Sequence, residues 1–261
     1  MGLEQQLRGA LFRMTRRLVL KRSLPEEFNH APLLATSEGG LRYLFRSMED
    51  VDPHLLKFAM DYVNPGNTVW DIGSNIGLFA FAAAARSGQH GKVLCVEADV
   101  WLVKLLRETA MLQEMSSAEV EVLSAAAARN VELRTFNVAK RTRSANYLEG
   151  YGTTEAKGSR SKQLVLTVSL DWLAEQYPLP QVVKIDVEGA EVEVLEGARE
   201  MLAKARPVVA CEVAKENAEE VAAVFKDLNY RMYDLDLEPS LRTEHDSPPP
   251  NTLAIPAERA F

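Results

Sequence analysis

At the centre of this chain stands Thr68-Val69-Trp70-Asp71-Ile72-Gly73-Ser74-Asn75-Ile76-Gly77, an apolar strand that ends in an acid and turns into the apolar helix 78–85. This pattern predicts the first β-loop-α unit of an open α/β sheet, whose ligands bind at the carboxyl ends of the strands. Gly73 permits a backbone with positive φ and a close approach to a ligand, and Gly77 permits tight packing of the helix on the strand. Asn75 belongs to the few residue types that tolerate such a loop.

The residues of this turn separate two classes of ligand. A dinucleotide site has the spacing G-x-G-x-x-G, with a pyrophosphate at the helix N-terminus. Here Gly73 and Gly77 are four residues apart, and Asp71 carries a negative charge that would repel a phosphate and suits a cationic amino group. The turn therefore predicts a ligand other than a dinucleotide, and a tight turn that binds no ligand remains the alternative.

Length and composition favour one large α/β domain. The chain has 261 residues, of which 47% are hydrophobic and 26% are charged, enough for one full core and little beyond it. A formal charge of -7 argues against a nucleic acid as partner, because phosphate contacts need clustered Lys and Arg. The only cysteines, Cys95 and Cys211, lie in two different apolar runs that read as strands too far apart for a disulfide. Two free thiols fit a reducing cytoplasm.

Residues 1–24 read as a basic amphipathic helix, with Leu3, Leu7, Leu11, Met14 and Leu18 on one stripe. The stripe is too short for a membrane span and has no cleavage site of a signal peptide. Three readings stay open: a helix packed on the body or on a second subunit, peripheral contact with an anionic membrane, or a disordered arm. We expect three parts, namely this helix or arm over 1–30, a β-hairpin and helix capping the ligand crevice over 31–63, and the ligand-binding domain over 64–261.

Within the second part, two short strands are expected in 32–45 about the turn Ser37-Glu38-Gly39-Gly40, followed by a helix from Asp52-Pro53 to about Val63. In the third part, the apolar strand 93–97 ends in Glu97, about 20 residues beyond the glycine turn. That is where an α/β nucleotide site places a carboxylate on the ribose hydroxyls. The alternative is an acid that caps the helix beginning near Val100. After the next strand, Ser124, Ala125 and Ala126 leave room for an adenine ring.

A second diagnostic stretch is Val182-Val183-Lys184-Ile185-Asp186-Val187-Glu188-Gly189-Ala190-Glu191, a strand that ends in acids and turns into a helix expected to reach about Ala203. A buried lysine in such a strand needs a carboxylate partner. We expect Lys184 to pair with Asp71 or Glu212 from a neighbouring strand, and Asp186 to reach the crevice. A structural ion pair without chemistry is the alternative.

On these two stretches the chain resembles the FkbM family of S-adenosylmethionine-dependent methyltransferases, which mostly methylate oxygen on sugars and natural products. Residues 71–77 correspond to the family's first motif, although Ser74 is more often alanine there, and residues 184–191 correspond to its most specific signature. The resemblance implies a doubly wound, Rossmann-like, seven-stranded mixed sheet in the order 3-2-1-4-5-7-6 with strand 7 antiparallel. It covers about 33 to the C-terminus and leaves out the first 30 residues.

The resemblance also implies roles for individual residues. Asp186, Glu188 and Glu212 are candidates for the base that takes the proton from an acceptor hydroxyl. The residues implied in binding S-adenosylmethionine are Asp71, Gly73, Ser74, Asn75, Gly77, Glu97, Ala98, Ser124, Ala125 and Asp186. No metal ligands are assigned, although a divalent metal bound by the same acids is an open alternative. The acceptor is expected to be a small molecule or glycan, the chain could form an oligomer, and a non-catalytic cofactor-binding module or an NAD-dependent oxidoreductase are the competing functions.

Overall fold

The computed structural model describes residue 15, residues 18–152 and residues 156–260. The strands are β1 Val19–Ser23, β2 Pro32–Thr36, β3 Thr68–Ile72, β4 Lys92–Glu97, β5 Glu119–Ser124, β6 Ala126–Ala127, β7 Glu132–Ala139, β8 Tyr147–Leu148, β9 Ser159–Val168, β10 Val182–Ile185, β11 Val208–Glu212, β12 Tyr230–Asp234 and β13 Asn251–Pro256. The α-helices are α2 Arg42–Phe45, α3 Pro53–Tyr62, α4 Leu78–Ser87, α5 Val100–Ala110, α6 Leu170–Gln176, α7 Glu191–Glu196, α8 Arg199–Ala205 and α9 Ala218–Asp227.

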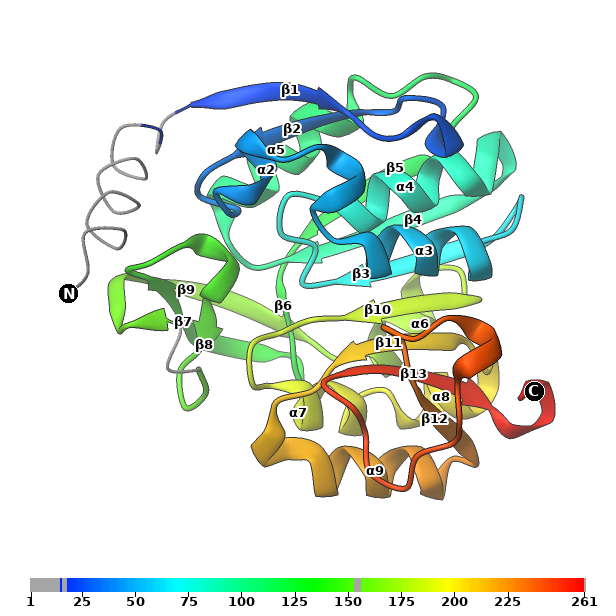
Figure 1. The fold of residues 1–261 in the computed structure, drawn as a ribbon. Helices are drawn as coiled ribbons and strands as arrows, with labels where there is room; N and C mark the ends of the chain where they lie inside the picture. Colours follow the sequence, from blue (N-terminus) through cyan, green and yellow to red (C-terminus); the bar gives the residue numbers. More distant parts are fainter. Residues whose placement is uncertain (1–14, 16–17, 153–155, 261) are drawn as a thin grey trace.

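A seven-stranded sheet forms the centre of the molecule, in the spatial order β12-β13-β11-β10-β3-β4-β5 (Figure 1). The strands β11, β10, β3, β4 and β5 run parallel to one another, whereas β13 is antiparallel to both β11 and β12. Read from β5 across to β12, this is the order 3-2-1-4-5-7-6 with strand 7 antiparallel. The predicted fold class is confirmed, and the tips of β3, β4, β10 and β11 all lie at one edge of the sheet.

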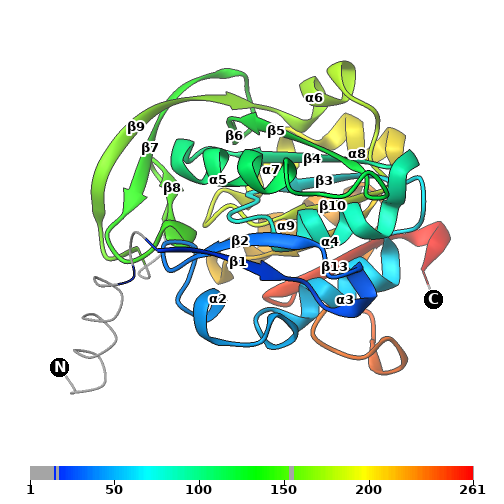
Figure 2. The same ribbon diagram turned by 90° about the horizontal axis from the view of Figure 1, so that it is seen from above.

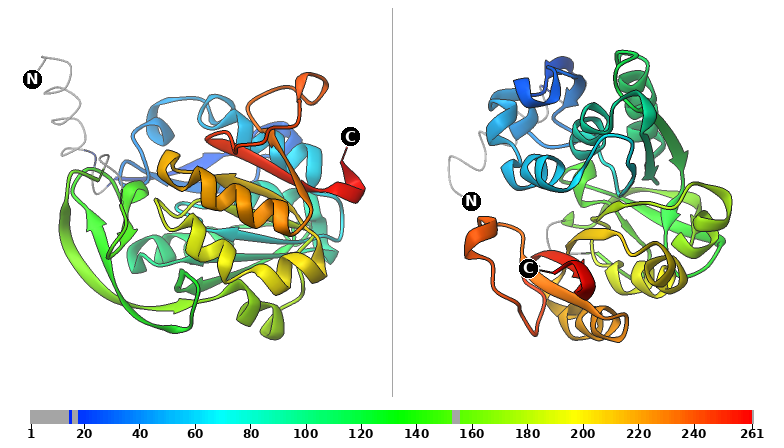
Figure 3. Two further views of the ribbon diagram at one scale, coloured as in Figure 1. Left: turned by 90° about the horizontal axis from the view of Figure 1, so that it is seen from below. Right: turned by 90° about the vertical axis from the view of Figure 1, so that its right-hand side faces the viewer.

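Helices cover both faces of this sheet and bury two separate cores (Figures 1 and 3). The core under α3, α4 and α5 contains Phe58, Phe79 and Cys95, and the core under α6 to α9 contains Trp70, Phe225 and Cys211. Each strand supplies both cores, because successive side chains point to opposite faces. Both cysteines are free and buried, three strand spacings apart as expected.

The N-terminal region differs from the prediction in two ways. The helix expected over 1–24 gives way to β1, which pairs antiparallel with β2, and residues 1–14 and 16–17 lie outside the described part. The hairpin is therefore β1–β2, whose two strands lie side by side in Figure 2, and it crosses the expected boundary at 30/31. The second strand expected within 32–45 is wrong, because residues 42–45 form the short helix α2. Helix α3 begins at Pro53 as predicted, since proline fits the first helical turn.

A second, four-stranded sheet in the order β6-β9-β7-β8 stands beside the central one (Figure 1). The sequence did not indicate that these strands form a sheet of their own. The helix expected from 191 to about 203 is also broken, into α7 and α8 at Gly197. A Cβ there would lie 2.6 Å from the carbonyl oxygen of Ala128, so the chain passes too close for a side chain. Over the described residues, no helix combines the length and apolarity that crossing a membrane requires.

Candidate active site

The tips of β3 and β10 are in direct backbone contact. Gly73 has φ +75° and its N–H donates to the Val96 carbonyl oxygen at 2.9 Å. A Cβ built on Gly73 would lie 1.8 Å from the carbonyl oxygen of Asp186, a distance that no side chain can satisfy. Glycine is therefore required here for its missing Cβ as well as for its φ.

Gly77 has a different role from Gly73. It is the N-cap of α4 with φ +87°, and a Cβ would lie 2.6 Å from the Phe81 ring and 2.7 Å from Leu106 Cδ2. Gly77 does not line the cavity described below, so its evident role is to let the start of α4 pack closely against Phe81 and the Leu106 side chain of α5.

Lys184 connects the two tips. Its Nζ donates to the Gly73 carbonyl oxygen at 2.7 Å and lies 3.3 Å from Asp71 Oδ1 and 3.4 Å from Asp186 Oδ2. Burial opposes the charge of Lys184, but the two carboxylates outweigh burial and raise the pKa of the lysine above its usual value. Burial raises the pKa of Asp71 above its usual value, and the charge of Lys184 offsets part of this effect. The expected pairing with Asp71 is confirmed, and because Asp71 is fully buried, much of its charge is compensated within the protein.

Glu97, at the end of β4, is almost completely buried. Its Oε2 accepts the Asn75 N–H and its Oε1 accepts the Asp99 N–H, both at 2.9 Å. Burial raises the pKa of Glu97 to about 7, against the lowering effect of these hydrogen bonds. Asp99, and not Glu97, caps α5 by accepting the Trp101 N–H at 2.9 Å. Glu97 is therefore not needed as the helix cap.

A single cavity of about 1650 Å³ collects most of the predicted site residues. The predicted residues that line it are Asp71, Gly73, Ser74, Asn75, Glu97, Ala98, Ala125, Asp186, Glu188 and Glu212. Gly77 and Ser124 do not line it, and Ser124 is exposed at the end of β5. Ala125, Ala126 and Ala127 form an apolar part of the cavity wall.

The carboxylates at the tips of β10 and β11 act on each other. The charge of Asp186, followed by burial, raises the pKa of Glu212 to about 7. Glu212 lies at the exposed rim, so the charge of its neighbour is the main cause. Glu188, in the same loop as Asp186, has φ +52°, an uncommon conformation for a residue with a side chain. Within the described ranges, no group of three or more His, Cys, Asp and Glu residues is placed to hold a metal ion.

The segment between β2 and α3 adds residues that the sequence did not single out. Tyr43 is buried and its hydroxyl donates to Asp52 Oδ2 at 3.0 Å, while Arg42 Nη1 lies 2.9 Å from Asp52 Oδ1. Burial raises the pKa of Asp52, partly offset by Arg42. All three residues line the cavity opposite the central sheet. No spacing in the sequence indicates this contact.

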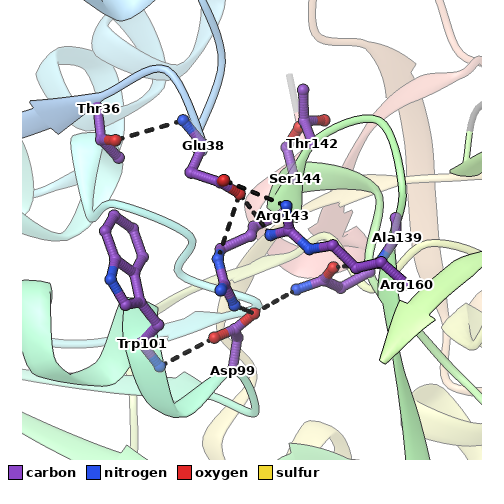
Figure 4. A network of polar contacts seen from close by, with 10 residues as sticks. Thr36, Glu38, Asp99, Trp101, Ala139, Thr142, Arg143, Ser144 and Arg160 are labelled. Carbon is purple, nitrogen blue, oxygen red and sulfur yellow. Dashed lines mark hydrogen bonds and ion pairs between the residues drawn. The ribbon is translucent and has the colours of Figure 1, made fainter. Parts of the chain in front are cut away.

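A network of charges lies beside the cavity and reaches it through Arg143 (Figure 4). Arg143, from the connection between β7 and β8, donates to the fully buried Asp99 and lies with its Nε 3.3 Å from Glu38 Oε2. Arg160 also contacts Glu38, through Nη2 to Oε2 at 2.5 Å and Nη1 to Oε1 at 3.1 Å. Arg160 lies where the β7–β9 register shifts between Val138 and Ala139, and such a bulge re-aims a side chain. The network joins the capping segment, the central sheet and the second sheet.

Sequence comparison identifies a family for this chain. The model of the methyltransferase FkbM domain matches residues 71–232, more than half of the chain and the whole stretch from the glycine turn to β12. No curated protein matches.

Structural comparison finds methyltransferases. An FkbM methyltransferase from Methylobacillus flagellatus KT is 12% identical, with a TM-score of 0.48, over 97% of this chain and 60% of its own. This chain therefore spans 60% of the length of that protein. The precorrin-6y C5,15-methyltransferase of Geobacter metallireducens GS-15 is 13% identical over 77% of this chain and 85% of its own, with a TM-score of 0.43. TYW2 of P. horikoshii, in complex with MeSAdo, is 12% identical over 90% of this chain and 70% of its own, with a TM-score of 0.46.

The two motifs quoted from the sequence lie inside the matched residues, at the facing tips of β3 and β10. The chain belongs to the FkbM family of S-adenosylmethionine-dependent methyltransferases.

Proposed function

We propose that this protein transfers a methyl group to a hydroxyl oxygen of a small acceptor, of the class of sugars, glycolipids and hydroxylated natural products. The observation that carries the proposal is the pair Asp186 and Glu212 in the cavity that also holds the glycine loop and Glu97. A hydroxyl is a poor nucleophile and needs a base, and an efficient base has a pKa near the working pH. Glu212, with a pKa raised to about 7, meets that requirement.

The residues around the glycine loop suit S-adenosylmethionine. Each Glu97 oxygen accepts one backbone N–H and keeps capacity to accept from a ribose hydroxyl. Asn75 Oδ1 is buried and, among the described residues, accepts no hydrogen bond, so it can take one from a donor in the cavity. The small side chains of Ala98 and Ala125 leave space for an adenine ring. Asp71, Gly73, Ser74 and Asp186 would line the methionine end.

The protein's share of the reaction is to orient the acceptor and to remove its proton. S-adenosylmethionine supplies a methyl group on a sulfonium that is already activated by its positive charge. Lys184 fixes the Asp186 carboxylate at 3.4 Å and so sets where the acid edge of the cavity lies. Glu212 takes the hydroxyl proton, Asp186 keeps the pKa of Glu212 raised, and Glu188 is the remaining candidate for the base. Tyr43 and Asp52 line the same cavity and would limit the positions that the acceptor can take beside these acids.

The test begins with calorimetric titration of the full chain with S-adenosylhomocysteine and, separately, with NAD. Binding of S-adenosylhomocysteine without NAD is the expected result, and the reverse would point to an oxidoreductase. The second step measures S-adenosylhomocysteine production with a panel of hydroxylated acceptors, followed by mass spectrometry of the product. Methyl groups found only on nitrogen or carbon would contradict the oxygen assignment, and cofactor binding with no turnover across the panel would favour a non-catalytic module.

A further inference from the structure

The cavity has a second pole, opposite in charge to its acids. Lys140 and Lys157 both line it, and neither forms an ion pair or side-chain hydrogen bond with any residue that the structure describes. Among the other cations that line the cavity, Lys184 pairs with Asp71 and Asp186, Arg143 with Asp99 and Glu38, and Arg42 with Asp52. Both lysines are exposed to solvent, and in a chain of net charge -7 they stand out because no residue that the structure describes offsets their charge.

The two lysines are brought together by the end of the β7–β9 ladder. The last paired residues are Ala139 and Ser159, and beyond them the Lys140 N–H donates to the Gly158 carbonyl oxygen at 2.9 Å. The Nζ of Lys140 lies 3.9 Å from where a Cβ on Gly158 would stand, so the ammonium folds over the turn that carries Lys157. The two lysines therefore start from neighbouring backbone positions beside the cavity.

The turn itself is held in an unfavourable conformation. Lys157 has φ +51° and Gly158 has φ +83°, and left-handed φ is uncommon for a lysine. Non-glycine residues held in such regions gather at ligand sites, where the surrounding structure enforces the conformation. The ladder and the strained turn together place the backbones of both lysines at the cavity wall.

The chemistry of this wall favours a phosphate. Lysine binds phosphate as a compact point charge, whereas a planar carboxylate is matched best by the two-pronged guanidinium of arginine. Thr142 and Ser144 line the same wall, and their hydroxyls share one hydrogen bond at 2.7 Å, which leaves one hydroxyl proton available to donate. A cavity of about 1650 Å³ exceeds the roughly 300 to 1000 Å³ of a site for one small ligand, so it holds an acceptor beside a cofactor.

We infer that the acceptor carries a phosphate group, bound by Lys140 and Lys157, while the hydroxyl to be methylated faces Asp186 and Glu212. This inference rests on the proposed function and narrows its acceptor to phosphate esters of hydroxylated molecules such as sugar phosphates. Asp186 and Glu212 contact the reacting hydroxyl, and the two lysines orient the acceptor by binding its phosphate. The contact between lysine and phosphate is present both before and during the reaction.

The experiment titrates the full chain, saturated with S-adenosylhomocysteine, with glucose 1-phosphate, inorganic pyrophosphate and glucose by calorimetry at low ionic strength. Both phosphate-bearing probes are expected to bind at least about tenfold more tightly than glucose, since each charge-assisted contact is strong and unscreened in dilute salt. The double variant Lys140→Ala/Lys157→Ala is expected to lose this preference. The matched control is Lys204→Ala/Lys215→Ala, which removes the same charge from exposed positions outside the cavity and is expected to keep it.

Three results would overturn the inference. If the phosphate-bearing probes bind no better than glucose, there is no anion site. If Lys204→Ala/Lys215→Ala loses the preference for these probes to the same extent, the preference comes from the net charge of the protein and not from the two cavity lysines. Weaker binding of S-adenosylhomocysteine in Lys140→Ala/Lys157→Ala, measured by the same method, assigns the lysines to the cofactor. If the wild-type chain does not bind S-adenosylhomocysteine at all, the proposed function fails instead, which is recognised before any probe is added.

Discussion

Gly73 and Asp186 touch through their backbones, so closely that a Cβ at position 73 would stand 1.8 Å from the Asp186 carbonyl oxygen. The Lys184 side chain bonds both partners, the first at its carbonyl and the second at its carboxylate. The glycine loop and the acid loop therefore form one rigid unit, and the position of the cofactor-binding residues depends on that of the candidate bases.

Gly73→Ala is expected to disrupt this unit. The variant combines the cost of left-handed φ, about 1 kcal/mol, with a backbone clash that must move one of the two tips. Gly66→Ala is the matched control, because Gly66 has φ +81° but no atom within 4 Å of a Cβ. Urea unfolding should show a loss of about 1 kcal/mol for Gly66→Ala and several times more for Gly73→Ala. Equal losses would mean that the two tips separate easily.

Lys184→Met is expected to destabilise the fold by about 3 to 5 kcal/mol at pH 7, because it leaves the buried Asp71 and its neighbour Asp186 without a counter-ion. Loss of the lysine raises the folded-state pKa of Asp71 further above its unfolded value. The deficit should therefore shrink as the pH falls, since the unpaired carboxylate becomes protonated. Denaturant midpoints at pH 7 and pH 5 measure this, and a deficit independent of pH would contradict the role of Asp71.

Glu97→Gln is expected to weaken S-adenosylhomocysteine binding by about tenfold or more, because a neutral amide replaces a charged acceptor of ribose hydroxyls. The change also turns an amide NH₂ toward one of the two backbone N–H groups that Glu97 accepts, so a modest fall in Tm should accompany it. Glu119→Gln, at an exposed position on β5, is the control for charge. Unchanged affinity in calorimetry would show that Glu97 does not contact the cofactor.

The rate of methyl transfer at saturating cofactor should rise with pH and level off above an apparent pKa near 7. Glu212 accepts a proton only when deprotonated, and Asp186 holds its pKa at about 7. Glu212→Gln should remove this dependence and lower kcat by about 10²-fold or more. Asp186→Asn should move the midpoint to lower pH, because the neighbouring charge is gone. If Asp186→Asn leaves the midpoint of the pH–rate profile unchanged, Glu188 becomes the preferred candidate for the base.

Arg143→Ala should loosen the side of the cavity that the second sheet closes. The variant leaves the fully buried Asp99 without its arginine and removes one of the arginines that contact Glu38. Hydrogen exchange is expected to accelerate across 132–148, and S-adenosylhomocysteine should bind more weakly. Arg199→Ala, which breaks a half-exposed pair with Glu196, should change neither, since such pairs contribute at most about 1 kcal/mol. Equal rates of hydrogen exchange over 132–148 in the two variants would argue that the network does not hold the second sheet against the cavity.

The central sheet could be predicted because its signals are local. The parallel strands β3, β4, β10 and β11 are short apolar runs with an acid at or next to their ends, and residues at these tips meet because parallel strands end at one edge. The pairing of Lys184 with Asp71 followed from the same geometry, since a buried ammonium must find a carboxylate on an adjacent strand.

The remaining elements depend on contacts between distant segments. The β1 stretch Val19-Leu20-Lys21 fits the end of a helix as well as a strand, and only its pairing with β2 decides between them. Glu38, Asp99 and Arg143 come from three segments, and no spacing in the sequence links them. Gly197 breaks the predicted helix for a reason visible only in space, the close passage of Ala128.

Cys95 and Cys211 lie in different cores, one on each face of the central sheet, and burial raises the pKa of both thiols. Neither sulfur reacts with an alkylating reagent while its own layer stays closed, because the thiolate is the reactive form and the reagent has no access. Each thiol therefore reports the opening of one of the two cores. Their labelling rates would show whether the layers on either side of the sheet open together or one before the other.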